Sequence, residues 1–224
     1  MGCDIHSFVE KKNVETGKWE QIRGFKSDYY DENDEYFSTD EFKNGKTILD
    51  CRNYSEFAIL ADVRNGYGFA GCDTGDAIEP IDMPRGLPID VSDEVKWESD
   101  DYGCDGHSHS WLTAKDIKDY APEKVRDIHR GFVSVEIYKQ FKETGNHYPC
   151  CGGISGGKVI IESNDACEQR QKDNPDKDVY TQIEWTTTAK DSAKWLFGEG
   201  LDQLMARSSE PDGSDVRIVF FFDN

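Results

Sequence analysis

The stretch Val216–Asn224, VRIVFFFDN, closes the sequence and decides the fold that we expect. Apart from Arg217, it is a run of β-branched and aromatic residues as far as Phe222. Such residues favour a pleated strand, and a run without polar alternation is typical of a strand covered on both faces. We therefore expect a central strand that ends at Asp223. For this carboxylate the sequence favours a solvated chain end over a position in a cleft.

The first residues of the chain predict the neighbouring element, a β-hairpin. Apolar and polar residues alternate from Ile5 to Glu10, and the segment KWEQI at 18–22 follows a turn that contains Gly17. Alternate side chains of a strand share a face, so Asp4 and His6 should project from the same side. The hairpin thus presents a carboxylate and an imidazole close together.

Several short helices follow from capping residues that precede apolar positions at helical spacing. They are expected to be capped at Ser55, Ser92, Thr113 and Ser134. Gly145 would end the last of them. The segment 188–208, TAKDSAKWLFGEGLDQLMARS, predicts the longest helix, weakened by two glycines. Residues 158–162 and 179–185 predict two further strands.

Together these elements predict an α+β fold with a single globular domain over residues 1–224. Its sheet would be mixed and mostly antiparallel, packed by several short helices and one longer C-terminal helix. Long irregular loops are expected because residues 64–90 are rich in glycine and proline. The acidic, aromatic segment 26–47 has no periodicity and predicts an exposed loop or lid.

The charge of the chain limits its partners. The sequence carries 45 acidic and 26 basic residues, a formal net charge of −19. Its average surface therefore repels DNA, RNA and anionic membranes, which argues against passive coating of nucleic acid. A small anionic ligand is still compatible, because a local cluster of arginines or a metal outweighs distant charge within a Debye length of about 8 Å.

The cysteines and the hydropathy indicate a cytosolic protein. Seven cysteines without regular spacing, and no apolar leader segment, do not fit a secreted disulfide framework. No run approaches the ~18 apolar residues of a membrane span. We therefore expect a reducing cytosol and no membrane.

Two pairs of residues with the same spacing predict the functional site. Asp4 and His6 form the first pair, and His107 and His109 form the second, in a loop that glycines allow to approach another strand. Three imidazoles and a carboxylate suit Zn, Mn or Fe with an open position for water or substrate. Such a metal acidifies bound water and neutralises a phosphoryl oxygen, so hydrolysis is the chemistry we expect.

Other interpretations of these residues stay open. The site could be a polar active or binding site without a metal. The two histidines of HSHS could also be structural, with His109 ordering the entry to a helix, and Asp4 could bond backbone amides. Near such a site the chain offers three arginines that suit fork-like binding of phosphate. They are Arg52, Arg64 and Arg85.

Three further motifs carry less weight. The segment GGISGGK at 152–158 fits part of a P-loop, but Val159 replaces the Ser or Thr that would hold Mg²⁺, and a strand is expected to follow. The segment HYPCC at 147–151 lacks the C-x-x-C spacing of a structural zinc site. Cys3 is a poor nucleophile for His6, because alternating strand positions separate the two side chains.

Longer blocks of the chain resemble an uncharacterised protein family of tailed phages, prophages and bacteria. These blocks are MGCDIH, RNYSEFAILADVRNG, PRGLPIDVS, HSHSWLT and the terminal VRIVFFFDN. The resemblance implies a phage or mobile-element context and action in the host cytosol. A partial similarity to calcineurin-like metallophosphoesterases rests on D-x-H, G-H-x-H and G-N-H. Their order is scrambled here, which argues against homology.

The sequence thus predicts a metal-dependent hydrolase, a phosphodiesterase of a nucleotide or cyclic oligonucleotide signal. Asp4, His6, His107 and His109 would hold the metal, and the three arginines would receive phosphate charge. The phage resemblance suggests counter-defence as its purpose. The alternative is a phage protein without turnover, which sequesters a nucleotide or inhibits a host protein through its acidic, aromatic surface.

Overall fold

A computed structural model describes residues 2–29 and 45–223. They group into two compact units. The first unit comprises Met1–Asn65, Ile78–Val125 and Thr188–Asn224, and the second comprises Gly66–Ala77 and Arg126–Thr187. Both units combine helices with a sheet, so the expected α+β class is confirmed. The prediction of one domain over residues 1–224 stays a prediction.

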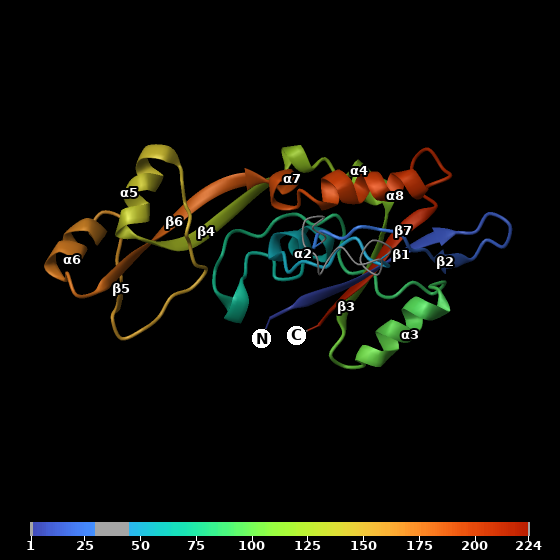
Figure 1. The fold of residues 1–224 in the computed structure, drawn as a ribbon, viewed down its shortest axis with the longest axis horizontal. Coiled ribbons are helices and arrows are strands. Elements are labelled where there is room, and N and C mark those ends of the chain that lie inside the picture. The colour runs from blue at the N-terminus through green and yellow to red at the C-terminus, as the bar shows by residue number, and fades with distance from the viewer. Residues whose placement is uncertain (1, 30–44, 224) are drawn as a thin grey trace. The chain divides into compact units, whose positions relative to one another are not determined.

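The first unit is built on a four-stranded sheet in the order β2-β1-β7-β3, in which every pairing is antiparallel. Its strands are β1 (Asp4–Lys12), β2 (Trp19–Gln21), β3 (His107–Thr113) and β7 (Val216–Asp223). The terminal strand β7 lies between β1 and β3, with all residues but the last buried (Figure 1). The expectation of a central strand is therefore confirmed, as is the N-terminal hairpin.

Helices cover both faces of this sheet, which explains why β7 needs apolar residues at successive positions. One face, with Phe220 and Phe222, joins the main core together with α2, α4 and α8. The other face, with Phe8 and Phe221, packs on Val95 of α3. The two elements far apart in the sequence, β1 and β7, lie side by side along their whole length (Figure 1).

The helices of the first unit begin largely where capping residues predicted. Helix α3 spans Asp93–Tyr102, and α4 (Ala114–Asp119) starts with a capping box of Thr113 and Asp116. The prediction for α2 (Tyr54–Ala61) was wrong by two residues, because Asn53 rather than Ser55 accepts the capping hydrogen bond, from the Glu56 amide. A short 3-10 turn, η2 (Pro122–Lys124), ends this part of the chain.

The expected long C-terminal helix over 188–208 is broken. The segment forms α7 (Ala189–Ser192), a π-helical turn η3 (Leu196–Gly200) and α8 (Leu201–Arg207). Ala193 ends α7 with φ −119° and ψ 52°. Within η3, Gly198 has φ −112° and ψ −112°, outside the helical region, and interrupts the helix again. Glycine makes this break possible because it has no Cβ to restrict its backbone.

The second unit holds a three-stranded sheet in the order β4-β6-β5, in which β5 and β6 run parallel. Its strands are β4 (Arg126–Ser134), β5 (Val159–Ile161) and β6 (Asp178–Thr188). Its helical elements are η1 (Phe69–Gly71), α5 (Val135–Thr144) and α6 (Cys167–Asp173). Ser134 caps α5 and Gly145 ends it in the left-handed conformation, as the sequence predicted.

Two long loops were predicted from the sequence, at 26–47 and 64–90. The predicted loop or lid at 26–47 falls mostly outside the described residues, which include only its ends, 26–29 and 45–47. Between residues 64 and 90 the chain is irregular apart from η1, as the glycines and prolines indicated. None of the helices formed by residues 2–29 and 45–223 has the length and apolarity needed to cross a bilayer.

Candidate functional site

The start of β1 and the end of β7 meet at one end of the first unit's sheet. Asp4 lies opposite Asp223, and His6 lies opposite Phe221. His6 Nε2 is 3.2 Å from Asp223 Oδ2, while the other carboxylate oxygen accepts a hydrogen bond from the Asp4 amide at 3.2 Å. Asp223 is therefore a member of this site, and the interpretation as a solvated chain end was wrong.

The imidazole of His6 is held between aromatic rings. Its ring centroid lies 4.2 Å from that of Tyr102 and 5.0 Å from that of Phe221. The side chain keeps 23% of its surface exposed, and that of Asp223 keeps 26%. Among residues 2–29 and 45–223, His6 Nδ1 has no hydrogen-bond partner. A carboxylate on one ring nitrogen fixes the tautomer and leaves the other nitrogen open to accept a proton.

Asp4, which the sequence placed in the site with His6, forms an ion pair with Arg52. Arg52 donates to its two oxygens, from Nε at 2.8 Å and from Nη2 at 2.6 Å. This bidentate pair lowers the pKa of the Asp4 carboxyl, because the hydrogen bonds and the positive charge favour its ionised form. Both side chains are about half exposed, so the pair forms the rim of the site.

The HSHS segment does not lie flat along its strand. The register of β3 against β7 shifts between His107 and Ser110, and Ser108 has φ +50°. Such a bulge inserts a residue and re-aims the side chains next to it. His107 consequently stacks on Phe222 and His109 on Phe221, which belong to opposite faces of the sheet.

The two histidines therefore have different surroundings. His109 Nε2 lies 2.8 Å from the hydroxyl of Ser99 in α3, and burial lowers its pKa. His107 Nε2 lies 4.0 Å from the Cys3 sulfur, and burial followed by the charge of Arg64 lowers the pKa of this imidazole. Burial also raises the pKa of the Cys3 thiol, which is fully covered, so Cys3 is not an accessible nucleophile.

The described residues do not bring the four predicted metal ligands together, and the metal itself stays a prediction. In the part of the chain that the structure describes, no three His, Cys, Asp or Glu side chains come close enough to hold an ion. Asp4 is engaged by Arg52, and the bulge sends His107 to the far face. The prediction assumed a regular strand through His107 and His109. The sequence did not indicate the bulge, because serine rarely adopts the left-handed conformation that Ser108 has here.

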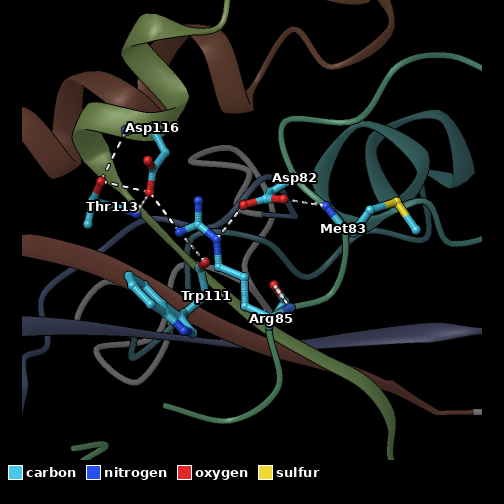
Figure 2. A network of polar contacts seen from close by, with 7 residues as sticks. Asp82, Met83, Arg85, Trp111, Thr113 and Asp116 are labelled. Atoms are coloured by element: carbon cyan, nitrogen blue, oxygen red, sulfur yellow. Dashed lines mark hydrogen bonds and ion pairs between the residues drawn. The ribbon is translucent and has the colours of Figure 1, made fainter. Parts of the chain in front are cut away.

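The three arginines proposed for phosphate separate into two groups. Arg52 lies on the rim with Asp4, and Arg64 lies near Cys3 and His107. The charge of Arg64 helps to lower the pKa of His107 and partly offsets the rise that burial causes in the pKa of Cys3. Arg85 lies elsewhere. Its guanidinium donates to Asp82 at 2.7 Å and to Asp116 at 3.0 Å, and it covers the Trp111 ring (Figure 2).

Behind the site lies a group of carboxyls that the sequence analysis missed. Burial raises the pKa of Asp50, an effect that His6 partly offsets, and also that of Asp28, which accepts hydrogen bonds from the Asp50 and Cys51 amides. Glu56 in α2 is 1% exposed, and burial, assisted by Asp28, raises its pKa to about 8. The sequence did contain a signal for this buried carboxyl, because Glu56 stands among the apolar residues of α2.

The weaker motifs lie in the second unit. The strand β5 directly follows Lys158, so no helix N-terminus is available to the GGISGGK segment, as expected. His147 of HYPCC stacks on Trp185 at 4.3 Å, and all seven cysteines are free. His147 thus packs within the second unit.

Comparison of the chain with protein-family models, with curated proteins and with solved structures gives no match. The resemblance to a phage and bacterial family stays a prediction.

Proposed function

We propose that the chain is a hydrolase of small phosphodiesters, with His6 as its proton carrier and Asp223 as the residue that positions it. The observation that supports this most is the His6–Asp223 pair at an open end of the sheet, with an imidazole nitrogen that faces no protein partner among the described residues. The pair matches the arrangement of a general base oriented by a carboxylate. The substrate class is nucleotide-like, as the sequence predicted.

The proposed step needs only groups of this chain. Asp223 accepts a hydrogen bond from Nε2 of His6, so that Nδ1 takes a proton from an attacking water. The water oxygen bonds to phosphorus opposite the ester oxygen, and the ester P–O bond breaks. The imidazolium then releases its proton to solvent, and the leaving oxygen takes up a proton from solvent. Proton transfer by a positioned side chain contributes roughly 10²–10⁴-fold to such a rate.

Positive charge near His6 supports a phosphate in this place. Arg52 on the rim is half exposed, and a guanidinium presents more donors than the two that Asp4 uses. The net charge of −19 favours a small ligand over a long polyanion. The proposal places the protein in a host cytosol, acting on a nucleotide signal.

The test compares two carboxylate-paired histidines. We expect purified protein to hydrolyse bis(p-nitrophenyl) phosphate or a cyclic dinucleotide in the presence of EDTA, and His6→Ala to lose roughly 10²-fold or more in kcat/KM. His129→Ala is the matched control, because His129 in the second unit pairs with Asp127 at the same 3.2 Å. Activity that EDTA abolishes and Zn or Mn restores would replace this proposal with the metal-dependent one.

The second candidate is a protein that sequesters a nucleotide without turnover. It is supported by the partly exposed ring of Tyr102 beside His6, since aromatic faces stack on bases. The same experiment separates the two candidates. A binder retains the cyclic dinucleotide unchanged after long incubation, and calorimetry then shows affinity that depends on Tyr102 rather than on Asp223.

A further inference from the structure

The second unit carries a depression of about 800 Å³, built from its own residues. This volume lies within the range of ligand sites, about 300–1,000 Å³. The segments 68–74 and 152–155 wall the depression, and apolar side chains line it, among them Phe69, Phe132 and Ile154. Phe69 is 61% exposed, so the apolar lining can be reached from solvent. We call this depression the Phe69 groove.

Glycines allow the two segments that wall the groove to lie close together. A Cβ on Gly68 would lie 2.8 Å from the methyl carbon of Thr74, and one on Gly152 would lie 2.9 Å from it. A Cβ on Gly153 would lie 2.5 Å from the Cys72 sulfur. Since real Cβ atoms do not approach so closely, these contacts depend on glycine. The groove is therefore formed by the fold itself, which lowers the entropy cost of binding a partner.

The wall at 152–155 offers unpaired backbone groups. Its amides and carbonyls make no hydrogen bond with the described residues, although Cys151 just before it pairs with Phe132. Gly153 is exposed, and because glycine consists almost entirely of backbone, its exposure makes these groups accessible. Open backbone donors and acceptors are the groups that an extended peptide uses when it adds a strand to a protein. The groove thus favours a peptide over a compact small molecule.

Three carboxylates at the rim of the groove share one cation. Each accepts a hydrogen bond from Arg130, and they are Asp73, Asp76 and Glu184. Asp73 lines the groove, and Arg130 lies on the same strand face as Phe132, two residues along β4. The carboxylate side chains are 53–56% exposed, whereas that of Arg130 is 24% exposed. The surplus of negative charge faces solvent, so it attracts a cationic partner and repels an anionic one.

We propose that the Phe69 groove binds an extended segment of a partner protein, in which apolar residues are flanked by lysine or arginine. The apolar side chains pack on Phe69 and Phe132, the backbone pairs with 152–155, and the basic side chains meet the rim carboxylates. A second copy of this chain fits less well, because two copies with a formal charge of −19 each repel one another. The proposal does not depend on the hydrolase at His6, and either can fail without the other.

The probe is the acetylated and amidated peptide Lys-Leu-Phe-Leu-Lys, measured on the full chain by calorimetry. One counterpart carries Glu in place of both lysines, and a second carries Ser in place of the three apolar residues. We expect the lysine peptide to bind with Kd of roughly 0.1 mM and each counterpart at least about 10-fold more weakly. Hydrogen exchange of the amides at 152–155 should slow when the lysine peptide is bound, because it pairs with this segment.

Two variants locate the binding on the chain. Phe69→Ser should weaken the lysine peptide roughly 10-fold, and its matched control is Trp97→Ser, at an aromatic residue of α3 that is 66% exposed. Glu184→Gln should weaken the peptide roughly 3-fold, whereas Glu143→Gln, at an exposed position of α5, should leave the affinity unchanged. All four positions are exposed, so the melting temperatures should stay close to that of the parent chain.

The proposal is overturned if the lysine peptide does not bind at millimolar concentration or if the glutamate peptide binds as tightly. It is equally overturned if Phe69→Ser binds as well as the parent chain, or if exchange at 152–155 does not slow. Sedimentation tests the other occupant of the groove. Self-association of the chain that Phe69→Ser abolishes would assign the groove to a second copy and overturn the proposal.

Discussion

The strands β1 and β7 carry two polar pairs on the same face, and the pairs differ in how completely they are enclosed. At one end Glu10 and Arg217 are 0% and 2% exposed, and the guanidinium is also bound by Asp90. At the other end His6 and Asp223 keep about a quarter of their surface, and one imidazole nitrogen stays open. The closed pair serves the fold. The open pair keeps the solvent access that the proposed hydrolysis requires.

The largest expected effect lies at the closed pair. Replacing Arg217 by Leu leaves Glu10 buried without its cation, which should lower the free energy of unfolding by about 3–5 kcal/mol. Urea denaturation measures it. In the double variant Glu10→Leu, Arg217→Leu much of this loss should return, because no uncompensated charge then stays buried. A single variant as stable as the parent chain would show that the pair is not closed.

Glu56 can be compared with Glu10, because it is also a buried carboxyl, but one of its oxygens has no partner among the described residues. Burial raises its pKa from 4.5 to about 8, so the folded state keeps a proton that the unfolded state releases. Stability should therefore fall as pH rises from about 5 to 8, by on the order of 3 kcal/mol. Glu56→Gln should flatten this slope in denaturation at several pH values. Glu79→Gln, at an exposed position of the first unit, should leave it unchanged.

A smaller effect is expected at the bulge that separates His107 from His109. Ser108 has φ +50°, a conformation that costs a β-branched residue more than it costs serine or glycine. Ser108→Val should therefore lower stability by about 1–2 kcal/mol in thermal unfolding, and Ser108→Gly by less than about 0.5 kcal/mol. Equal effects of the two substitutions would show that the bulge does not depend on this backbone conformation.

The sequence predicted the parts of the fold that follow from local patterns. The run of apolar residues in β7 identified a central strand, and Thr113 with Asp116 identified a helix start, because each signal lies within a few residues. The break at Gly198 was underestimated, since glycine permits a kink without requiring one.

The sequence analysis named one residue of the proposed pair but not its partner. The spacing of Asp4 and His6 singled out His6, yet the partner of His6 comes from residue 223, and long-range register decides that pairing. Asp4 was assigned to a metal because no local pattern reveals Arg52 across the rim. His107 lies on the opposite face of the sheet from His6 because Ser108, a single residue in the left-handed conformation, produces the bulge.

A small effect on stability is expected at the open pair, and it is the most informative. Asp223→Asn keeps the shape of the side chain while it removes the charge that fixes the His6 tautomer. Since the pair is partly solvated, the free energy of unfolding should change by less than about 1 kcal/mol. Hydrolysis should nevertheless fall by 10-fold or more, in kcat rather than KM, because substrate still meets Arg52. A stability loss as large as that of Arg217→Leu, with hydrolysis unchanged, would place both ends of the strands in the same structural role.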